Sequence, residues 1–377
     1  MSNVTDVANA LGVSSKTVEK HCVFCGQRPV DKNKEHVIPD WAIRMSGDPK
    51  RECTIHTLSI DSAKRVMRFS FDQLQFPACT LCNSEFSDLE GQAKGIVERM
   101  LARQPVSATE LSVFLDWMDK VRVGLWLGIR YLDLNSFPID PNFYIAHRIG
   151  TADRVACLML TDAPALRLTF SCVSTIAFRY QPSSFALCIN GLSTFNASTD
   201  FLIARRMGLP HPHRIEWDQS GMLRMQLQAG AERVMRPPLR AALPQAGTWL
   251  YQPMVRPEFV EAFGALWDTD YARHAFWDLN TGFGAVFVGA VFVGNGDGSI
   301  SLYPQERSNR WLHSTRYASS GEAIRAAADV ALKIQMELLD LPSVDRLPKE
   351  RQKSRRMFDR LVRADLRARK KSLDYVK

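Results

Sequence analysis

Four cysteines near the start of the chain have the spacing of a metal site. Cys22 and Cys25 form one C-x-x-C pair, and Cys79 and Cys82 form a second. Four thiolates are the ligand set of a closed tetrahedral zinc site, which stabilises small units that cannot bury enough apolar surface by themselves. The repeated pair favours zinc over the alternative of buried free thiols. The spacing therefore predicts one structural Zn ion.

A second group of residues, suited to a different metal, lies beside these pairs. Glu35 and His36 are neighbours between the two pairs, and Asn83 follows the last cysteine directly. Carboxylate and amide oxygens suit a hard divalent cation, so Glu35 and Asn83 are candidate ligands for Mg or Mn. His36 is the candidate general base, because a neutral imidazole can deprotonate an attacking water near neutral pH. Asn83 has a plainer alternative as a helix N-cap.

Strand geometry constrains how Glu35 and His36 can work together. Neighbouring residues of a straight strand point to opposite faces, so the two side chains cannot both face one metal ion. Pro39 biases the residue before it away from helix, and a bend there would let Glu35 reach the cation while His36 turns toward a water. The predicted chemistry is metal-assisted hydrolysis, in which the cation neutralises charge on the group under attack.

The runs CVFCG, KEHVIPDW, PACTLCN and SDLE together resemble the zinc-braced subtype of the HNH (ββα-metal) endonuclease family. The resemblance extends from about Cys22 to Glu90. It implies a short β-hairpin that carries Glu35 and His36 and packs on a helix starting near Cys82. It also implies metal-dependent cleavage of DNA, double-stranded or branched, that leaves 5′-phosphate and 3′-hydroxyl ends.

The sequence departs from the family pattern at two places. Asn83 stands where the third letter of the motif is often His, a variant found among zinc-braced members. The family's middle Asn, which tethers the histidine loop, has no counterpart, and Asp72 or Gln73 lies nearest to its place. Glu90 follows Asn83 by two helical turns and so shares its face of the predicted helix. It is a candidate supporting residue or an ordinary ion-pair partner.

Length and composition indicate a globular chain of two or three domains. The chain has 377 residues, 46% hydrophobic content and no low-complexity tract. No apolar run is long enough to span a bilayer, and the N-terminus is polar where a signal peptide would be apolar. We therefore expect a reducing cytoplasm and no membrane association, which also suits thiolates reserved for metal.

The net charge of +8 is carried entirely by the C-terminal end. From Val344 to Lys377 there are 13 Lys or Arg against 5 Asp or Glu. Pro348 can open a helix, and a basic helix after it would contact DNA phosphates. The alternative is a solvated helix, and basic tails also bind RNA, membranes or acidic partners.

Periodicity divides the rest of the chain into helical and β-like parts. Residues 87–103 and 108–132 have helical spacing. Trp117 and Lys120 of the second helix occur at similar positions in the resembling proteins, although packing explains them equally well. Residues 142–303 are β-like, and NGDGS between two apolar runs predicts a hairpin. A last helix precedes the basic tail.

These parts predict an α+β protein of five segments. They are a helical lead-in over 1–21, a zinc-braced HNH nuclease module over 22–104, a helical connector over 105–140, a mixed β-rich domain over 141–343 and a basic helical tail over 344–377. The leading function is a DNA endonuclease. Its rival is a non-catalytic zinc module that binds nucleic acid or scaffolds a partner, and such a module has no need for Glu35, His36 and Asn83 together. The sequence leaves an oligomer open and assigns no chemistry to the β-rich domain.

Overall fold

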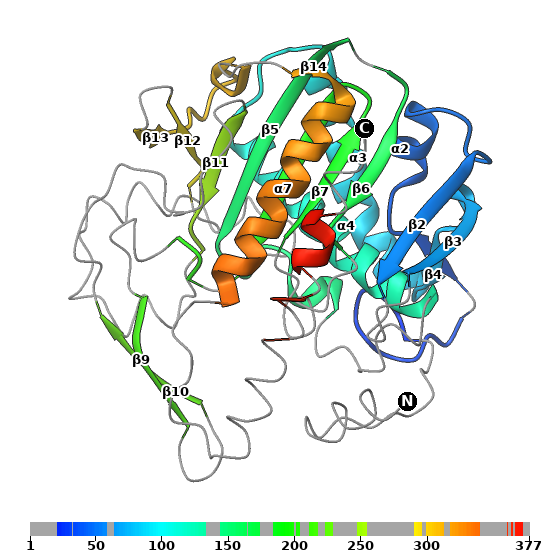
Figure 1. Cartoon of the computed structure of the whole chain (residues 1–377), viewed down its shortest axis with the longest axis horizontal. Coiled ribbons are helices and arrows are strands. Elements are labelled where there is room, and N and C mark those ends of the chain that lie inside the picture. The colour runs from blue at the N-terminus through cyan, green and yellow to red at the C-terminus, as the bar shows by residue number, and fades with distance from the viewer. Residues whose placement is uncertain are drawn as a thin grey trace.

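The computed structural model describes a mixed α+β chain (Figure 1). The described residues are 21–31, 33–58, 64–132, 144–163, 165–173, 184–199, 201–203, 211–217, 223–228, 247–254, 290–295, 299–312, 317–339, 360, 363–364 and 366–371. The expected lead-in, apart from His21, and most of the expected basic tail lie outside them. Among the described residues no helix is long and apolar enough to cross a bilayer.

The N-terminal part is built from two short antiparallel strands followed by a long helix. Strand β1 (Lys34–His36) pairs with β4 (Gln75–Pro77), and helix α3 (Thr80–Leu101) follows β4 directly. Between β1 and β4 the chain adds smaller elements: helix α2 (Asp40–Met45), the antiparallel hairpin of β2 (Glu52–Leu58) and β3 (Lys64–Ser70), and the 3₁₀ turn η1 (Phe71–Gln73).

Helix α3 begins earlier than the sequence predicts. The expected helix starts at Ser87, whereas α3 starts at Thr80 and ends at Leu101. The difference arises because the second cysteine pair is part of the helix, with Cys79 as its extended N-cap and Cys82 in its first turn. Polar residues there lower the apolar signal, but the resemblance to zinc-braced proteins correctly placed a helix start near Cys82.

Helix α4 (Ala108–Leu132) has the predicted bounds and packs on α3 as a helical hairpin. Its start is fixed by a capping box. The backbone N–H of Ser107 donates to Glu110 Oε2 at 2.8 Å, and the N–H of Glu110 donates to Ser107 Oγ at 3.1 Å. Residues along most of the helix are buried, because α4 lies between α3 and a large sheet.

The large sheet has the strand order β13-β12-β11-β5-β8-β7-β6, with β14 beside β5. All of its pairs are antiparallel except the parallel pair β14–β5. Its strands are β5 (Arg154–Ala163), β6 (Leu168–Ser171), β7 (Ser184–Ile189), β8 (Leu192–Ser198), β11 (Thr248–Gln252), β12 (Phe292–Gly294), β13 (Ile300–Leu302) and β14 (Tyr317–Ser319). A separate hairpin joins β9 (His211–Trp217) to β10 (Leu223–Gln228). Short 3₁₀ turns lie at Ile145–His147 (η2) and Arg310–Leu312 (η6).

The predicted NGDGS hairpin is confirmed at the edge of this sheet. Strands β12 and β13 flank it as an antiparallel pair. The N–H of Asn295 donates to the carbonyl of Ser299 at 2.7 Å, which closes the turn.

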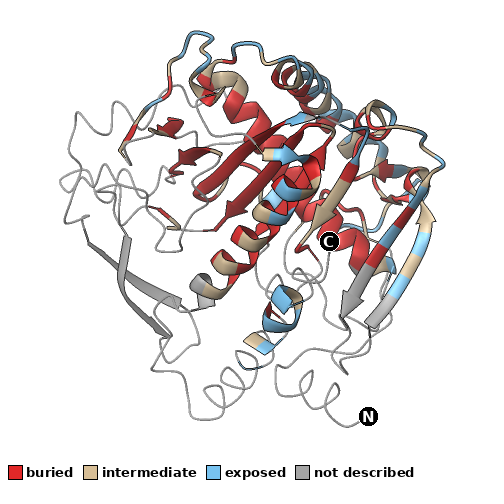
Figure 2. Ribbon diagram, turned by 45° about the horizontal axis from the view of Figure 1, so that its top comes forward, coloured by how far each residue is buried: buried red, intermediate tan, exposed pale blue. Residues whose placement is uncertain are grey.

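Helices cover both faces of the sheet. Along β5, Ala156 and Leu158 belong to one apolar core with α4, while Val155 and Cys157 belong to a second core with helix α7 (Ser320–Leu339). Alternation along a strand sends neighbouring side chains to opposite faces. Figure 1 shows α7 across one face of the sheet with α4 behind it, and Figure 2 shows buried residues concentrated in the sheet and the inward sides of the helices.

Candidate metal centre and its surroundings

The four paired cysteines come together at one point. The sulfur atoms of Cys22, Cys25, Cys79 and Cys82 all lie within 4.8 Å of one another, and Cys25 Sγ is 3.9 Å from Cys79 Sγ. Ligands about 2.3 Å from a tetrahedral zinc are about 3.8 Å apart, so the spacing fits that ion. Among the described residues no other group of three or more His, Cys, Asp or Glu side chains is as close. The structure therefore supports the predicted structural zinc site.

The thiols of this cluster differ in how readily they ionise. Burial, followed by the charge of Cys22, raises the pKa of Cys79 to about 12, and the same two causes raise the pKa of Cys82 further. Burial also opposes the thiolate of Cys25, but the Gln27 backbone and the neighbouring cysteines outweigh it through hydrogen bonds and lower its pKa. Four thiolates this close repel one another, and a divalent cation removes that repulsion.

The first cysteine pair is held by a tight turn. Gly26 has a φ of 76°, and its N–H donates to the carbonyl of Cys22 at 2.9 Å. A Cβ added at Gly26 would lie 2.3 Å from Cε2 of Tyr144. Only glycine suits this position, because both the backbone angle and the neighbouring ring exclude a side chain. The N–H of Cys79 donates to Cys22 Sγ at 3.3 Å and so ties the two pairs together.

Glu35 points away from solvent, toward helix α4. Its Oε1 accepts from Nζ of Lys120 at 2.5 Å, and the same ammonium donates to Glu90 on α3. Lys120 is 0% exposed and Glu35 is 6% exposed. We call Glu35, Glu90 and Lys120 the Lys120 cluster. Glu90 is thus an ion-pair partner of Lys120, one of the two alternatives that the sequence left open.

The electrostatics of the Lys120 cluster favour the ion pair. Burial opposes the charged ammonium, but Glu35 and Glu90 outweigh it and raise the pKa of Lys120. Burial also raises the pKa of Glu90, to about 7, against the lowering effect of Lys120. The cluster therefore pairs one ammonium with the Glu35 carboxylate, while the raised pKa of Glu90 reduces the negative charge left over near neutral pH.

His36 lies on the other face of β1. Its Nε2 is 3.2 Å from the backbone carbonyl oxygen of Asp72 and 2.8 Å from Nε2 of Gln75. The ring is half-buried. The register of the pair explains this arrangement, because Glu35 stands opposite Phe76 and His36 stands opposite Gln75. The opposed directions of Glu35 and His36 are those that strand alternation predicts.

Asp72 and Gln73, the residues nearest to the place of the missing Asn tether, make different contacts. Asp72 contacts His36 through its backbone carbonyl, while its carboxylate accepts from the hydroxyl of Ser70. Gln73 caps the η1 turn by accepting from the N–H of Ser70 at 3.3 Å. Nε2 of the histidine can therefore donate to the main-chain oxygen of Asp72 in one tautomer or accept from the Gln75 amide in the other, and the sequence pattern did not indicate Gln75. A backbone contact leaves no residue signature, which is why the motif has no recognisable tether at this position.

Asn83 is half-buried in the first turn of α3. Its N–H donates to the carbonyl of Cys79 at 3.0 Å, and Cys79 is the N-cap, so the alternative of an Asn83 N-cap is wrong. Within the described residues no hydrogen bond joins Asn83 to Glu35 or His36. Glu35 and His36 lie on opposite faces of β1, and the ligation of Mg or Mn by Glu35 and Asn83 stays a prediction.

A second buried charged group lies between α4 and the sheet. Arg154 on β5 pairs with Asp116 and, at 3.4 Å, with Asp119, and Arg122 pairs with Asp119 at 2.8 Å. These four residues, which we call the Arg154 cluster, are buried. The amide of Gln252 on β11 accepts from Arg154 Nε at 2.9 Å, which extends the cluster across the sheet.

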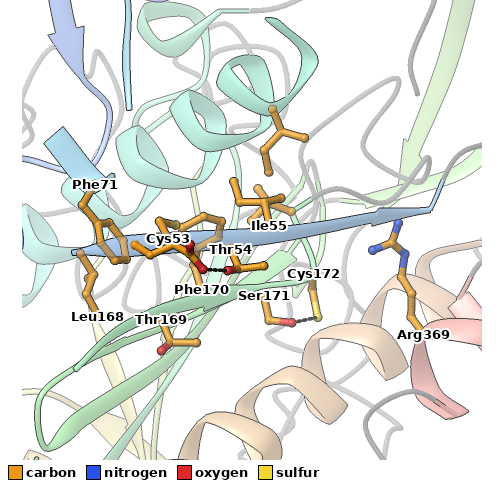
Figure 3. A pocket seen from close by; sticks show the side chains of 13 residues that line it. Cys53, Thr54, Ile55, Phe71, Leu168, Thr169, Phe170, Ser171, Cys172 and Arg369 are labelled. Carbon is orange, nitrogen blue, oxygen red and sulfur yellow. Dashed lines mark hydrogen bonds between the residues drawn. The ribbon is translucent and has the colours of Figure 1, made fainter. Parts of the chain in front are cut away.

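A cavity among the described residues lies elsewhere, between β2 and β6. It has a volume of about 360 Å³ and contains no residue of the candidate site. Figure 3 shows Cys53 and Thr54 of β2 on one side, Phe170 and Ser171 of β6 below them, and Arg369 at the far end. Its lining mixes thiol, hydroxyl and apolar groups without a convergent set of charges.

No protein-family model, curated protein or solved structure matches the chain. The candidate site is therefore defined by its own geometry and by the motif resemblance.

Proposed function

We propose that the unit of β1, β4 and α3 hydrolyses phosphodiester bonds of DNA, with His36 as the general base. The observation that carries the proposal is the placement of His36 on an antiparallel pair of short strands, β1 and β4, the second of which leads directly into a helix whose start lies at the four-cysteine cluster. This order of elements is the one that the resemblance to HNH endonucleases implies. The half-buried ring is accessible to a water, and its Nε2 lies within hydrogen-bond distance of the Asp72 carbonyl.

The contacts of the imidazole suit a general base. In the tautomer that donates from Nε2 to the Asp72 carbonyl, Nδ1 carries the lone pair that accepts a proton from water. The Asp72 carbonyl fixes the direction of the Nε2–H bond in this tautomer, so the direction of the Nδ1 lone pair is defined before substrate binds. A base held in this way loses little orientational freedom in the reaction. The amide nitrogen of Gln75 is itself a donor and can bond to Nε2 only in the other tautomer.

A hard divalent cation, Mg or Mn, is part of the proposal. When bound, it would supply charge neutralisation at the scissile phosphate and the leaving oxygen. The amide of Asn83 is the better placed of the two predicted ligands, because it is half-buried beside Cys82 and makes no hydrogen bond within the described part of the chain. Glu35 fits less well, since Lys120 already engages its carboxylate.

The direct experiment compares His36→Ala with the parent on supercoiled, linear and branched DNA, in Mg, Mn or EDTA. We expect a loss of cleavage of roughly two to four orders of magnitude, the usual span for removal of a general base. Zinc content and DNA binding should persist. His147→Ala removes an exposed histidine and serves as the matched control. Equal cleavage by His36→Ala and the parent would refute the assignment of His36.

One observation favours a second candidate function, a non-catalytic zinc module that binds nucleic acid or scaffolds a partner. The Lys120 ammonium neutralises the carboxylate that the resemblance assigns to the cation. Such a module would bind DNA in a zinc-dependent manner and leave every DNA form uncut in both Mg and Mn. That result with well-folded protein would select this candidate over the endonuclease.

The basic tail is the proposed guide to DNA. Arg360, Arg367, Lys370 and Lys371 are exposed in helical segments, while Leu366 is fully buried in the core shared with α7. Leu366 attaches the tail to the body, so charge substitution is a cleaner test than deletion.

Changing these four cations together to Gln should weaken binding to all sequences alike. It should also flatten the slope of log affinity against log salt by about 0.9 for each DNA phosphate that the tail no longer neutralises. Lys94→Gln with Arg325→Gln, on exposed faces of α3 and α7, is the control. An unchanged slope would assign the tail to another partner.

A further inference from the structure

Lys120 is a lysine without access to solvent, and its ammonium lies between two carboxylates. Nζ is 2.5 Å from Oε1 of Glu35 and also contacts Glu90, and it stands 5.6 Å from the centre of the Phe24 ring. The side chains of Glu35 and Glu90 contact each other as well. A buried charge is retained only when it is paired in this way.

This arrangement conflicts with a divalent cation on Glu35. Mg²⁺ demands octahedral oxygen coordination and usually keeps several waters. Glu35 is only 6% exposed and has an ammonium on its carboxylate. A cation there would meet the positive charge of Lys120 at close range in a low-dielectric site, where repulsion is strong. The donor set around Glu35 therefore suits an ammonium and does not suit a hydrated metal.

The same contacts fix the orientation of β1. The strand has three residues, and its register rests on the pairs Lys34 with Pro77, Glu35 with Phe76 and His36 with Gln75. A one-residue slip in so short a strand would exchange the faces of Glu35 and His36. With Glu35 held against α4 by Lys120, His36 must face the opposite side.

We infer that Glu35 is a positioning residue, which Lys120 and Glu90 anchor to α4 so that β1 presents His36 outward. The consequence for catalysis rests on the proposed function, whereas the anchoring itself does not. The anchor joins β1 to the consecutive helices α3 and α4, with Glu35 85 positions from Lys120 in the sequence. It makes the orientation of the general base depend on a helix outside the motif.

The test exchanges the charges of the pair. Glu35→Lys, Lys120→Glu and the double variant Glu35→Lys with Lys120→Glu are compared with the parent, all loaded with zinc. The readouts are the melting temperature, amide hydrogen exchange over residues 34–36, Mn²⁺ affinity and DNA cleavage. The double variant again places one ammonium against two carboxylates, but it removes the carboxylate from position 35.

We expect Lys120→Glu to lower the melting temperature by about 10 °C, because three carboxylates then share one buried site. The double variant should recover most of that loss, together with slow exchange over residues 34–36. It should bind Mn²⁺ within about threefold of the parent, and it should cleave DNA faster than Lys120→Glu. These results together would establish the anchor.

Two results would overturn the inference. If the double variant recovers the melting temperature but loses Mn²⁺ binding, Glu35 is a cation ligand. No recovery of the melting temperature or of exchange protection would mean that the pair does not anchor β1. If the double variant does not fold, Glu35→Gln with Lys120→Met replaces it, and weaker Mn²⁺ binding in that folded variant would equally refute the inference. A parent that never cleaves DNA would refute the proposed function and leave the stability test of the anchor valid.

Discussion

The two buried charged clusters that share helix α4 differ in what surrounds them. The Lys120 cluster holds a three-residue strand and has two carboxylates against one ammonium. The Arg154 cluster holds two Asp against two Arg and is tied to β5 and β11 of the large sheet. The first lies in the unit that also contains the four-cysteine cluster. The second lies between a long helix and a sheet that has an apolar core on each face.

This difference indicates which interactions stabilise the β1–β4 unit and which stabilise the large sheet. The β1–β4 pair is too short to specify itself by backbone pairing, so metal ligation and ion pairs at fixed points add to the burial of side chains such as Val37 and Phe76. The sheet region is specified by burial, and its charges add registry between α4 and the strands at a cost in desolvation. Substitutions in the β1–β4 unit should therefore unfold that unit alone, whereas substitutions in the Arg154 cluster should lower the stability of the whole fold.

The largest expected effect comes from disrupting the four-cysteine cluster. Cys79→Ser, or a strong chelator, should unfold the zinc module, because structural zinc contributes on the order of 10 kcal/mol to such units. The sheet and α7 should stay folded. Limited proteolysis with mass analysis, together with metal content, tests this. Cys53→Ala, at a buried cysteine outside the cluster, is the control and should keep its zinc. Simultaneous unfolding of the sheet would show that the two regions are not separable.

A smaller but global effect is expected at Arg154. Arg154→Met removes a buried guanidinium that pairs with both Asp116 and Asp119, which costs about 3–5 kcal/mol. Urea unfolding should show the loss in a single transition that includes α4. Arg167→Met, an exposed arginine before β6, should cost less than about 0.5 kcal/mol. An equal loss of unfolding free energy in the two variants would show that the Arg154 cluster does not stabilise the fold.

Replacing Gly26 or Gly91 by alanine should change the stability of the protein in opposite directions. Gly26→Ala should destabilise the zinc module by about 2 kcal/mol, because Gly26 has a positive φ and Tyr144 fills the space of a Cβ. Gly91→Ala should stabilise the protein by up to about 1 kcal/mol, since it lies inside α3 with no atom within 4 Å of the added Cβ. Thermal unfolding and zinc retention measure both. A neutral Gly26→Ala would mean that the knuckle tolerates a looser turn.

The smallest effect is a pH dependence at the start of α4. Burial opposes the charged form of Glu110, but Arg307, the Ser107 N–H and Arg99 outweigh it and lower the pKa of that carboxyl. A lowered folded-state pKa means that this stabilisation is present above the unfolded value of 4.5 and is lost as the pH falls through the folded value. Glu110→Gln should therefore cost roughly 1 kcal/mol at pH 7 and less at pH 3. The same cost at both pH values would contradict this assignment.

The sequence determined the elements whose signal is local. The two C-x-x-C pairs predicted the cysteine cluster, the apolar stripe predicted the bounds of α4, and NGDGS predicted the β12–β13 hairpin. Each of these depends on residues close together in the chain, so spacing alone is sufficient evidence. The start of α3 was placed too late because cysteine and asparagine in its first turns carry no helical periodicity.

Only the tertiary structure decided the partners. Lys120 reads as one charged residue in a packing helix, and nothing in its neighbourhood along the chain indicates Glu35, 85 positions away. The backbone carbonyl that holds His36 has no side-chain signature, and the strand order of the large sheet depends on pairings between distant segments. The sequence by itself determined which groups are present and where short-range order begins. The fold decided which of them meet, because burial brings together residues whose interaction no local pattern encodes.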